Sequence, residues 1–177
     1  MDIEYFDLHG RALQLRMLAW YCNVPHTNTR VNMAEFGEKK QKGMYRFGSM
    51  PVAKFQDGSQ MGQTQAIMRW IAQSCTGKRG EILYPGVMNP EVSYEIDNLT
   101  EFSDSYLGKF SEYLRNVSNE RAKELAEGPF RDVMFRIDAQ LKQNSSPNFL
   151  VGNCLTLADI SLGAYTLKWC VSDTHPH

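Results

Sequence analysis

The stretch PVAKFQDGSQMGQTQAIMRWIAQSC, residues 51–75, decides the fold of the first half of this 177-residue chain. It begins with a short apolar run, Pro51–Phe55. The dipeptide Asp57-Gly58 follows and is a strong signal for a tight hairpin turn. Residues 59–61 would return as the second strand, and residues 63–75 read as a helix. The stretch therefore predicts an antiparallel hairpin followed by a helix.

A strand, a helix and a second strand are predicted before this hairpin. Ile3–Phe6 is a short apolar run, and Arg11–Cys22 is a helical run dense in Leu, Met and Ala. Thr27–Val31 alternates weakly and indicates a strand. Residues 34–48 are polar with three glycines and predict either a long irregular connection or a short, poor helix. The order βαβ-ββα predicts an α/β domain with one mixed four-stranded sheet and helices packed on it.

The second half of the chain shows only helical patterns. Apolar residues recur every three or four positions from Val92 onward, which predicts a long helix. A second periodic stretch, Ala122–Leu141, contains Gly128-Pro129, where a kink or restart is expected. A last helix begins near Thr156, with a capping-box pattern. The predicted organisation is a domain of residues 1–76, a linker of residues 77–90 and an all-α domain of residues 91–177.

Composition and charge exclude several functional classes. Nineteen Lys and Arg against twenty Asp and Glu give a net charge of −1, which argues against a nucleic-acid partner. No apolar run approaches the roughly 18 residues of a membrane span, so no membrane partner is expected. The N-terminus lacks a secretory signal, and the four cysteines are widely spaced. A cytoplasmic protein with no metal site is therefore expected.

Four features of the first half converge on one end of the predicted sheet. Tyr5 ends the first strand, at the edge where open α/β sheets bind ligands, and Arg11 places a positive charge nearby. A cis Met50-Pro51 bond would leave the Met50 backbone free to pair with an extended peptide. Gln63-Thr64 begins a helix whose free N–H groups favour a carboxylate. Each feature alone has an ordinary structural explanation, but their combination favours a ligand site.

The chain resembles the cytosolic glutathione transferases, in particular their tyrosine-type classes and most of all the Sigma class. The matching stretches are YFDLHGRA (5–12), FGSMPV (47–52), GQTQAIMRWIA (62–72) and GNCLTLADI (152–160). They look like the family's catalytic-tyrosine turn, cis-proline loop, Gln-Ser helix start and second-domain capping box. They occur in the family's order over nearly the whole chain. Because family members usually continue with further helices, the resemblance implies a chain truncated at its C-terminus.

The resemblance implies a thioredoxin-like domain that binds glutathione and a helical domain that supplies much of the second substrate's pocket. Tyr5 and Arg11 would be catalytic, with the Tyr5 hydroxyl donating to the glutathione sulfur. The implied glutathione-binding residues are Tyr5, Arg11, Lys42, Ser49, Met50, Pro51, Gln63 and Thr64. Glutathione would be a co-substrate, with no permanently bound cofactor. The thiolate would attack a small hydrophobic electrophile, by conjugation or isomerisation.

The chain departs from the family pattern before the third strand. The family usually has a Trp and a Lys there that contact the glycyl carboxylate of glutathione. Phe36 stands near the place of the Trp, while Lys39, Lys40 and Lys42 compete for the place of the Lys. Spacing counted back from the proline favours Lys42.

The resemblance also implies a homodimer. Phe47 matches the place of an aromatic residue that some classes insert into the partner subunit, and in other classes it only packs within the loop. Asp104 is close to the place of an acidic residue that reaches the partner's glutathione. Both are candidates for dimer contacts.

The same fold also serves other functions. A cysteine-dependent enzyme of this fold needs a thiol at the start of the first helix. That interpretation is rejected, because the chain has His9-Gly10-Arg11 there. One alternative that stays open is a non-catalytic structural or docking module of the same fold in a larger assembly. Another is a peroxide-reducing or ligand-carrying role that uses the same glutathione site.

Overall fold

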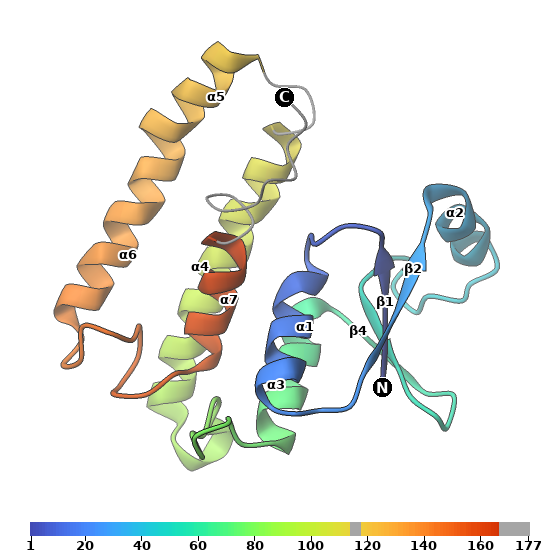
Figure 1. The fold of residues 1–177 in the computed structure, drawn as a ribbon, viewed down its shortest axis with the longest axis horizontal. Helices are drawn as coiled ribbons and strands as arrows, with labels where there is room; N and C mark the ends of the chain where they lie inside the picture. Colours follow the sequence, from blue (N-terminus) through green and yellow to red (C-terminus); the bar gives the residue numbers. More distant parts are fainter. Residues whose placement is uncertain (114–117, 167–177) are drawn as a thin grey trace. The chain divides into compact units, whose positions relative to one another are not determined.

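The computed structural model describes residues 1–113 and 118–166, which form two compact units (Figure 1). The first unit contains Met1–Tyr84 and the end of the last helix from Gly163, and the second contains Pro85–Leu162. The division after Tyr84 lies within the stretch 77–90 that was predicted as a linker. Residues 114–117 and 167–177 of the predicted helical domain lie outside the described residues.

The first unit contains a mixed four-stranded sheet, as predicted. Its elements are β1 (Asp2–Phe6), α1 (Ala12–Tyr21), β2 (Thr27–Val31), α2 (Met33–Gln41), β3 (Val52–Lys54), β4 (Gln60–Gly62) and α3 (Thr64–Ser74). The strand order is β2-β1-β3-β4. Strands β1 and β2 are parallel, whereas β3 is antiparallel to both β1 and β4.

The core of this unit lies between the sheet and the helices α1 and α3. Figure 1 shows these two helices on one side of the sheet and α2 on the other. Ile3 of β1, Leu15 of α1 and Ile67 of α3 are fully buried. Successive residues of a strand point to opposite faces, so Ile3 and Tyr5 share one face of β1 and Glu4 takes the other. All three residues are buried, so both faces of β1 are covered.

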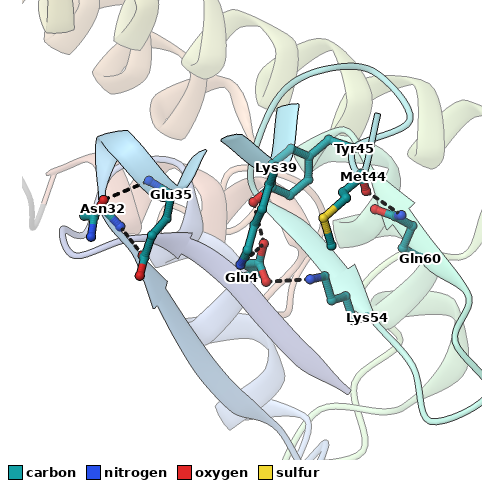
Figure 2. Close-up of polar contacts among 8 residues, drawn as sticks. All are labelled: Glu4, Asn32, Glu35, Lys39, Met44, Tyr45, Lys54 and Gln60. Carbon is teal, nitrogen blue, oxygen red and sulfur yellow. Dashed lines mark hydrogen bonds and ion pairs between the residues drawn. The ribbon is translucent and has the colours of Figure 1, made fainter. Parts of the chain in front are cut away.

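Helix α2 resolves the choice that the sequence left open for residues 34–48. The Asn32 side chain accepts a hydrogen bond from the Glu35 N–H at 2.9 Å, and the Glu35 carboxylate accepts one from the Asn32 N–H at 3.0 Å (Figure 2). This reciprocal capping box satisfies two N–H groups at the start of the helix. Residues Met33–Gln41 therefore form a nine-residue helix and not an irregular connection.

The described part of the second unit contains helices and the loops that connect them. Its elements are the 3₁₀ helix η1 (Gly86–Met88), α4 (Pro90–Tyr113), α5 (Asn119–Leu125), the π-helical segment η2 (Ala126–Phe130), α6 (Arg131–Gln143) and α7 (Leu157–Thr166), whose last residues belong to the first unit. The interruption expected at Gly128-Pro129 is this π-helical segment, which has Pro129 inside it. None of the helices in the described residues is long and apolar enough to cross a membrane.

The start of α7 carries the predicted capping pair in a modified form. The Asp159 carboxylate accepts hydrogen bonds from the Thr156 N–H at 2.8 Å and from the Thr156 hydroxyl at 2.9 Å. Its other oxygen accepts a bond from the Leu150 N–H at 2.8 Å. Asp159 therefore joins the start of α7 to the loop before it.

Candidate active site at the carboxyl end of strand β1

The Tyr5 hydroxyl lies against the backbone turn that leads into α1. It accepts a hydrogen bond from the Arg11 N–H at 3.3 Å. Gly10 lies against the Tyr5 ring and has φ +41°. A Cβ added to Gly10 would stand only 2.6 Å from the Tyr5 hydroxyl oxygen. Only glycine fits there, because a side chain would overlap the phenol and the backbone is in the left-handed region. The turn thus brings a backbone N–H to the phenol oxygen.

Two arginines that the sequence prediction missed support this turn. Arg16 of α1 donates to the Leu8 carbonyl at 3.2 Å and to the Asn28 side chain at 2.7 Å. Arg30 of β2 donates to the Leu8 carbonyl at 3.3 Å and forms an ion pair with Asp7 at 3.7 Å. Burial and then the neighbouring Arg30 charge lower the pKa of Arg16. The turn after Tyr5 is therefore held in a positively charged setting.

The loop before β3 has the backbone geometry on which the peptide-binding prediction depended. The Met50-Pro51 bond is cis. Pro51 is buried, Met50 is half-buried and Ser49 is exposed. Gly48, at φ +61°, donates its N–H to the Tyr45 carbonyl at 2.9 Å, which forms a tight turn just before Ser49.

The start of α3 has a strained backbone and a buried polar side chain. Gln63 has φ +68° and is exposed, although a residue with a side chain rarely adopts this conformation. Such strain is concentrated at functional sites. Thr64 follows as the first helical residue and is only 6% exposed. The amide of Gln65 is buried and has no hydrogen-bond partner in the described part of the chain. The Gln63 side chain makes no capping hydrogen bond to the first N–H groups of α3.

The three candidate lysines of α2 have different neighbours. Lys39 forms an ion pair with Glu4 at 3.4 Å. Lys42 ends the helix with an exposed side chain, 4.0 Å from Glu38. Lys40 lies over the Phe36 ring, and its Cε is 3.3 Å from where a Cβ of Gly48 would stand. The structure thus brings Lys40, rather than Lys42, next to the loop that leads to Ser49.

The predicted dimer contacts lie in different units. Phe47 is 55% exposed and packs against Gly62, where an added Cβ would be 3.3 Å from its ring. Asp104 lies on α4 in the second unit and is half-buried. In residues 1–113 and 118–166, no three His, Cys, Asp or Glu side chains gather as a metal site requires.

Known proteins similar to this chain identify its family. No protein-family model matches it. It is 30% identical over 160 residues to glutathione S-transferase 4 of Caenorhabditis elegans, covering 88% of this chain and 73% of the relative. It is 25% identical over 182 residues to human hematopoietic prostaglandin D synthase, covering 98% and 84%. The glutathione S-transferase of Ascaris lumbricoides has the same fold, with a TM-score of 0.75 at 19% identity, over 95% of this chain and 80% of that one.

The chain belongs to the glutathione S-transferase family. The predictions of this family, of its thioredoxin-like domain with a helical domain, and of a transferase enzyme are thereby confirmed. The roles of the individual residues, the class within the family and the electrophile are taken up as proposals below.

Proposed function

We propose that this chain is a tyrosine-type, Sigma-like glutathione transferase in which the Tyr5 hydroxyl stabilises the glutathione thiolate. The observation that carries the proposal is the hydrogen bond from the Arg11 N–H to the Tyr5 oxygen at 3.3 Å, in a turn that admits only glycine at position 10. A phenol whose oxygen already accepts a hydrogen bond is a better donor from its own O–H. That proton would point to the sulfur.

The energy required of this contact is modest. Lowering the thiol pKa by about two units takes about 2.7 kcal/mol of preferential stabilisation of the thiolate. A hydrogen bond to an ionised acceptor is roughly twice as strong as a neutral one, and more in a site that excludes water. The thiol proton leaves to solvent while Tyr5 keeps its own. The Arg11 side chain would add positive charge nearby.

The remaining contacts would bind and orient glutathione. The Met50 backbone, beside Ser49 and the cis Pro51, would pair with the cysteinyl residue. Gln63 and Thr64 would hold the γ-glutamyl carboxylate at the start of α3, where N–H groups favour an anion.

The glycyl carboxylate needs a cation on the opposite side of the tripeptide. The position of Lys40 beside Gly48 supports Lys40 for this role over Lys42, which spacing favoured. Lys39 is less suitable, because its ammonium is paired with Glu4.

The chemistry is an attack by the positioned thiolate on a small hydrophobic electrophile. The sulfur forms a bond to an electrophilic carbon, and the leaving group departs with the electron pair. Orientation of the two reactants supplies much of the rate. Isomerisation through the same thiolate is a second outcome, supported by the similarity to a prostaglandin D synthase. We also propose a cytoplasmic homodimer with Phe47 and Asp104 at its contacts.

Binding to immobilised glutathione, together with conjugation of glutathione to an aryl halide, tests the proposal. Tyr5→Phe is expected to lower the conjugation rate at least about tenfold while leaving retention largely intact. Tyr21→Phe is the matched control, because the Tyr21 hydroxyl donates to Glu81 at 2.6 Å at the other end of α1. It removes the same group without touching the site.

The other outcomes separate the remaining interpretations. Retention without turnover would favour a glutathione-binding module. If the unmodified chain neither binds to immobilised glutathione nor conjugates it, the structural or docking module would be favoured.

A further inference from the structure

The Glu4 carboxylate is a buried charge that the proposed reaction does not use. Its residue is 2% exposed and precedes Tyr5 in β1, on the other face of the sheet. It accepts hydrogen bonds from the Tyr45 hydroxyl at 2.6 Å and from the Lys54 ammonium at 2.5 Å, and the Lys39 ammonium is 3.4 Å away (Figure 2). A buried carboxylate needs such partners, because burial alone makes its charge costly.

The three partners come from three different segments. Lys39 is on α2, Tyr45 lies in the connection between α2 and β3, and Lys54 is the last residue of β3. Burial raises the pKa of Glu4, but the hydrogen bonds from Lys54 and Tyr45 and the two lysine charges outweigh it and leave that pKa lowered. Burial and the bond to Glu4 raise the pKa of Tyr45. At neutral pH Glu4 is therefore ionised and Tyr45 carries its proton.

Contacts lead from this cluster to the loop that would bind glutathione. The Tyr45 carbonyl accepts the Gly48 N–H at 2.9 Å, two residues before Met50. The Phe36 ring lies between Phe6 of β1, at 5.2 Å between centroids, and Tyr45, at 5.5 Å. Lys40 lies over Phe36 and beside Gly48. Through its bond to the Tyr45 hydroxyl, Glu4 thus holds the Tyr45 ring and the turn between Tyr45 and Gly48 that leads to Met50.

Stability alone is a weak explanation for such a cluster. Replacing a buried ion pair with apolar residues is often neutral or stabilising. The register of β1 on β3 is also set by the strand pairing of Glu4 with Val52 and its neighbours. What the cluster adds is a fixed position for α2 and for Tyr45, which the sheet does not hold by itself.

We propose that Glu4 is a positioning residue for glutathione, which holds α2 and residues 45–50 in the arrangement that receives the cysteinyl and glycyl parts of the tripeptide. This inference rests on the proposed function. Glu4 touches no reacting atom. Its removal acts through Lys39 and Tyr45, and so it weakens glutathione binding without altering how Tyr5 acts on the sulfur.

The test compares Glu4→Gln with Glu38→Gln. Both change a carboxylate to an amide, but Glu38 is on the exposed side of α2 and pairs only loosely with Lys42, at 4.0 Å. The measurements are KM and Kd for glutathione, kcat with an aryl halide, and the pKa of the bound thiol from thiolate absorbance. Glu4→Gln is expected to raise KM and Kd about fivefold, with kcat within about twofold and the thiol pKa unchanged. Glu38→Gln is expected to match the unmodified chain.

Each other result overturns the inference. A lowered melting temperature with an unchanged KM would show that Glu4 only stabilises the fold. A shift in kcat and thiol pKa along with KM would show that Glu4 acts on Tyr5. If Glu4→Gln does not fold, Tyr45→Phe removes only the hydroxyl and is expected to raise KM in the same direction by a smaller factor; an unchanged KM there overturns the inference. Failure of the unmodified chain to bind glutathione would instead overturn the proposed function, and this inference with it.

Discussion

Glu4 and Tyr5 are neighbours on β1, yet their polar groups have different kinds of partner. The Glu4 carboxylate meets three side chains from α2, its following loop and β3. The Tyr5 hydroxyl meets the backbone of a glycine turn. A carboxylate enclosed by donors has little capacity for a ligand, whereas a phenol backed by one N–H keeps its own proton to donate. The comparison fits the proposed roles, in which the Glu4 face of β1 holds neighbouring segments in place and the Tyr5 face meets glutathione.

The largest effect is expected from adding a methyl group on the Tyr5 face. In Gly10→Ala the new Cβ would stand 2.6 Å from the hydroxyl oxygen of Tyr5, which is buried and has little room to move. The cost is expected to be about 2–4 kcal/mol in the free energy of unfolding, from overlap plus left-handed strain, with a loss of conjugation at least as large as in Tyr5→Phe. Chemical denaturation and the aryl halide assay measure the two effects.

Gly58→Ala is the matched control for this change. Gly58 has φ +83° and no neighbour within 4 Å of an added Cβ, so it reports backbone strain alone, about 1–2 kcal/mol. Equal losses in the two variants would show that the turn does not crowd Tyr5.

A smaller effect is expected from removing the charge on the Glu4 face. Glu4→Gln is expected to cost about 1–3 kcal/mol of stability at neutral pH, because Lys39 and Lys54 lose a buried acceptor. The pKa of Glu4 is lowered in the folded chain, so its contribution is fully present above the ordinary value of 4.5 and disappears as the pH falls through the folded value. Unfolding of both proteins across the acid range measures this. A difference that does not shrink below that pH would contradict an ionised Glu4.

The third expected effect tests the far end of the ligand. Thr64→Ala is expected to weaken glutathione binding about threefold to tenfold, because a hydroxyl beside the γ-glutamyl carboxylate is lost. The pKa of the bound thiol should not change, since in the proposed mechanism Tyr5 and not Thr64 contacts the sulfur. Thr64→Ser keeps the hydroxyl and is expected to bind normally. Calorimetry and thiolate absorbance give the two quantities, and a matching shift in both would contradict the assignment of Thr64.

The smallest effect separates two lysines of α2. Lys40→Met is expected to raise KM for glutathione about twofold to fivefold, because an exposed ion contact is worth little. Lys42→Met is expected to raise it less, because Lys42 lies at the end of α2 beside Glu38. Steady-state kinetics at two salt concentrations measures both. A larger rise in KM for Lys42→Met than for Lys40→Met would instead support Lys42, which the sequence spacing favoured, as the contact for the glycyl carboxylate.

Local patterns made most of the fold predictable. The hairpin signal at Asp57-Gly58 and the helical spacing of residues 63–75 each depend on neighbours in sequence, and β3, β4 and α3 follow from them. Helix α2 was left open, although Asn32 and Glu35 have the spacing of a capping box. That signal was present in the sequence and would have decided the point.

The candidate site was predictable only in part. Tyr5 and Thr64 could be proposed as site residues because each belongs to a recognisable local motif, and the same kind of motif predicted the cis Met50-Pro51 bond that the structure shows. The contacts of Arg16 and Glu4 could not be predicted, because their partners come from other segments of the chain. Among the lysines of α2, spacing cannot decide which one meets the loop, since successive residues of a helix project in different directions.

The sequence by itself determined the family, the candidate residues at the carboxyl end of β1 and the order of strands and helices apart from α2, because all of these depend on short-range patterns. Only the tertiary structure decided that Glu4 would be enclosed by Lys39, Tyr45 and Lys54, and that Lys40 would lie beside Gly48. The physical reason is distance along the chain: Glu4 and Lys54 are fifty residues apart and meet only because β1 pairs with β3.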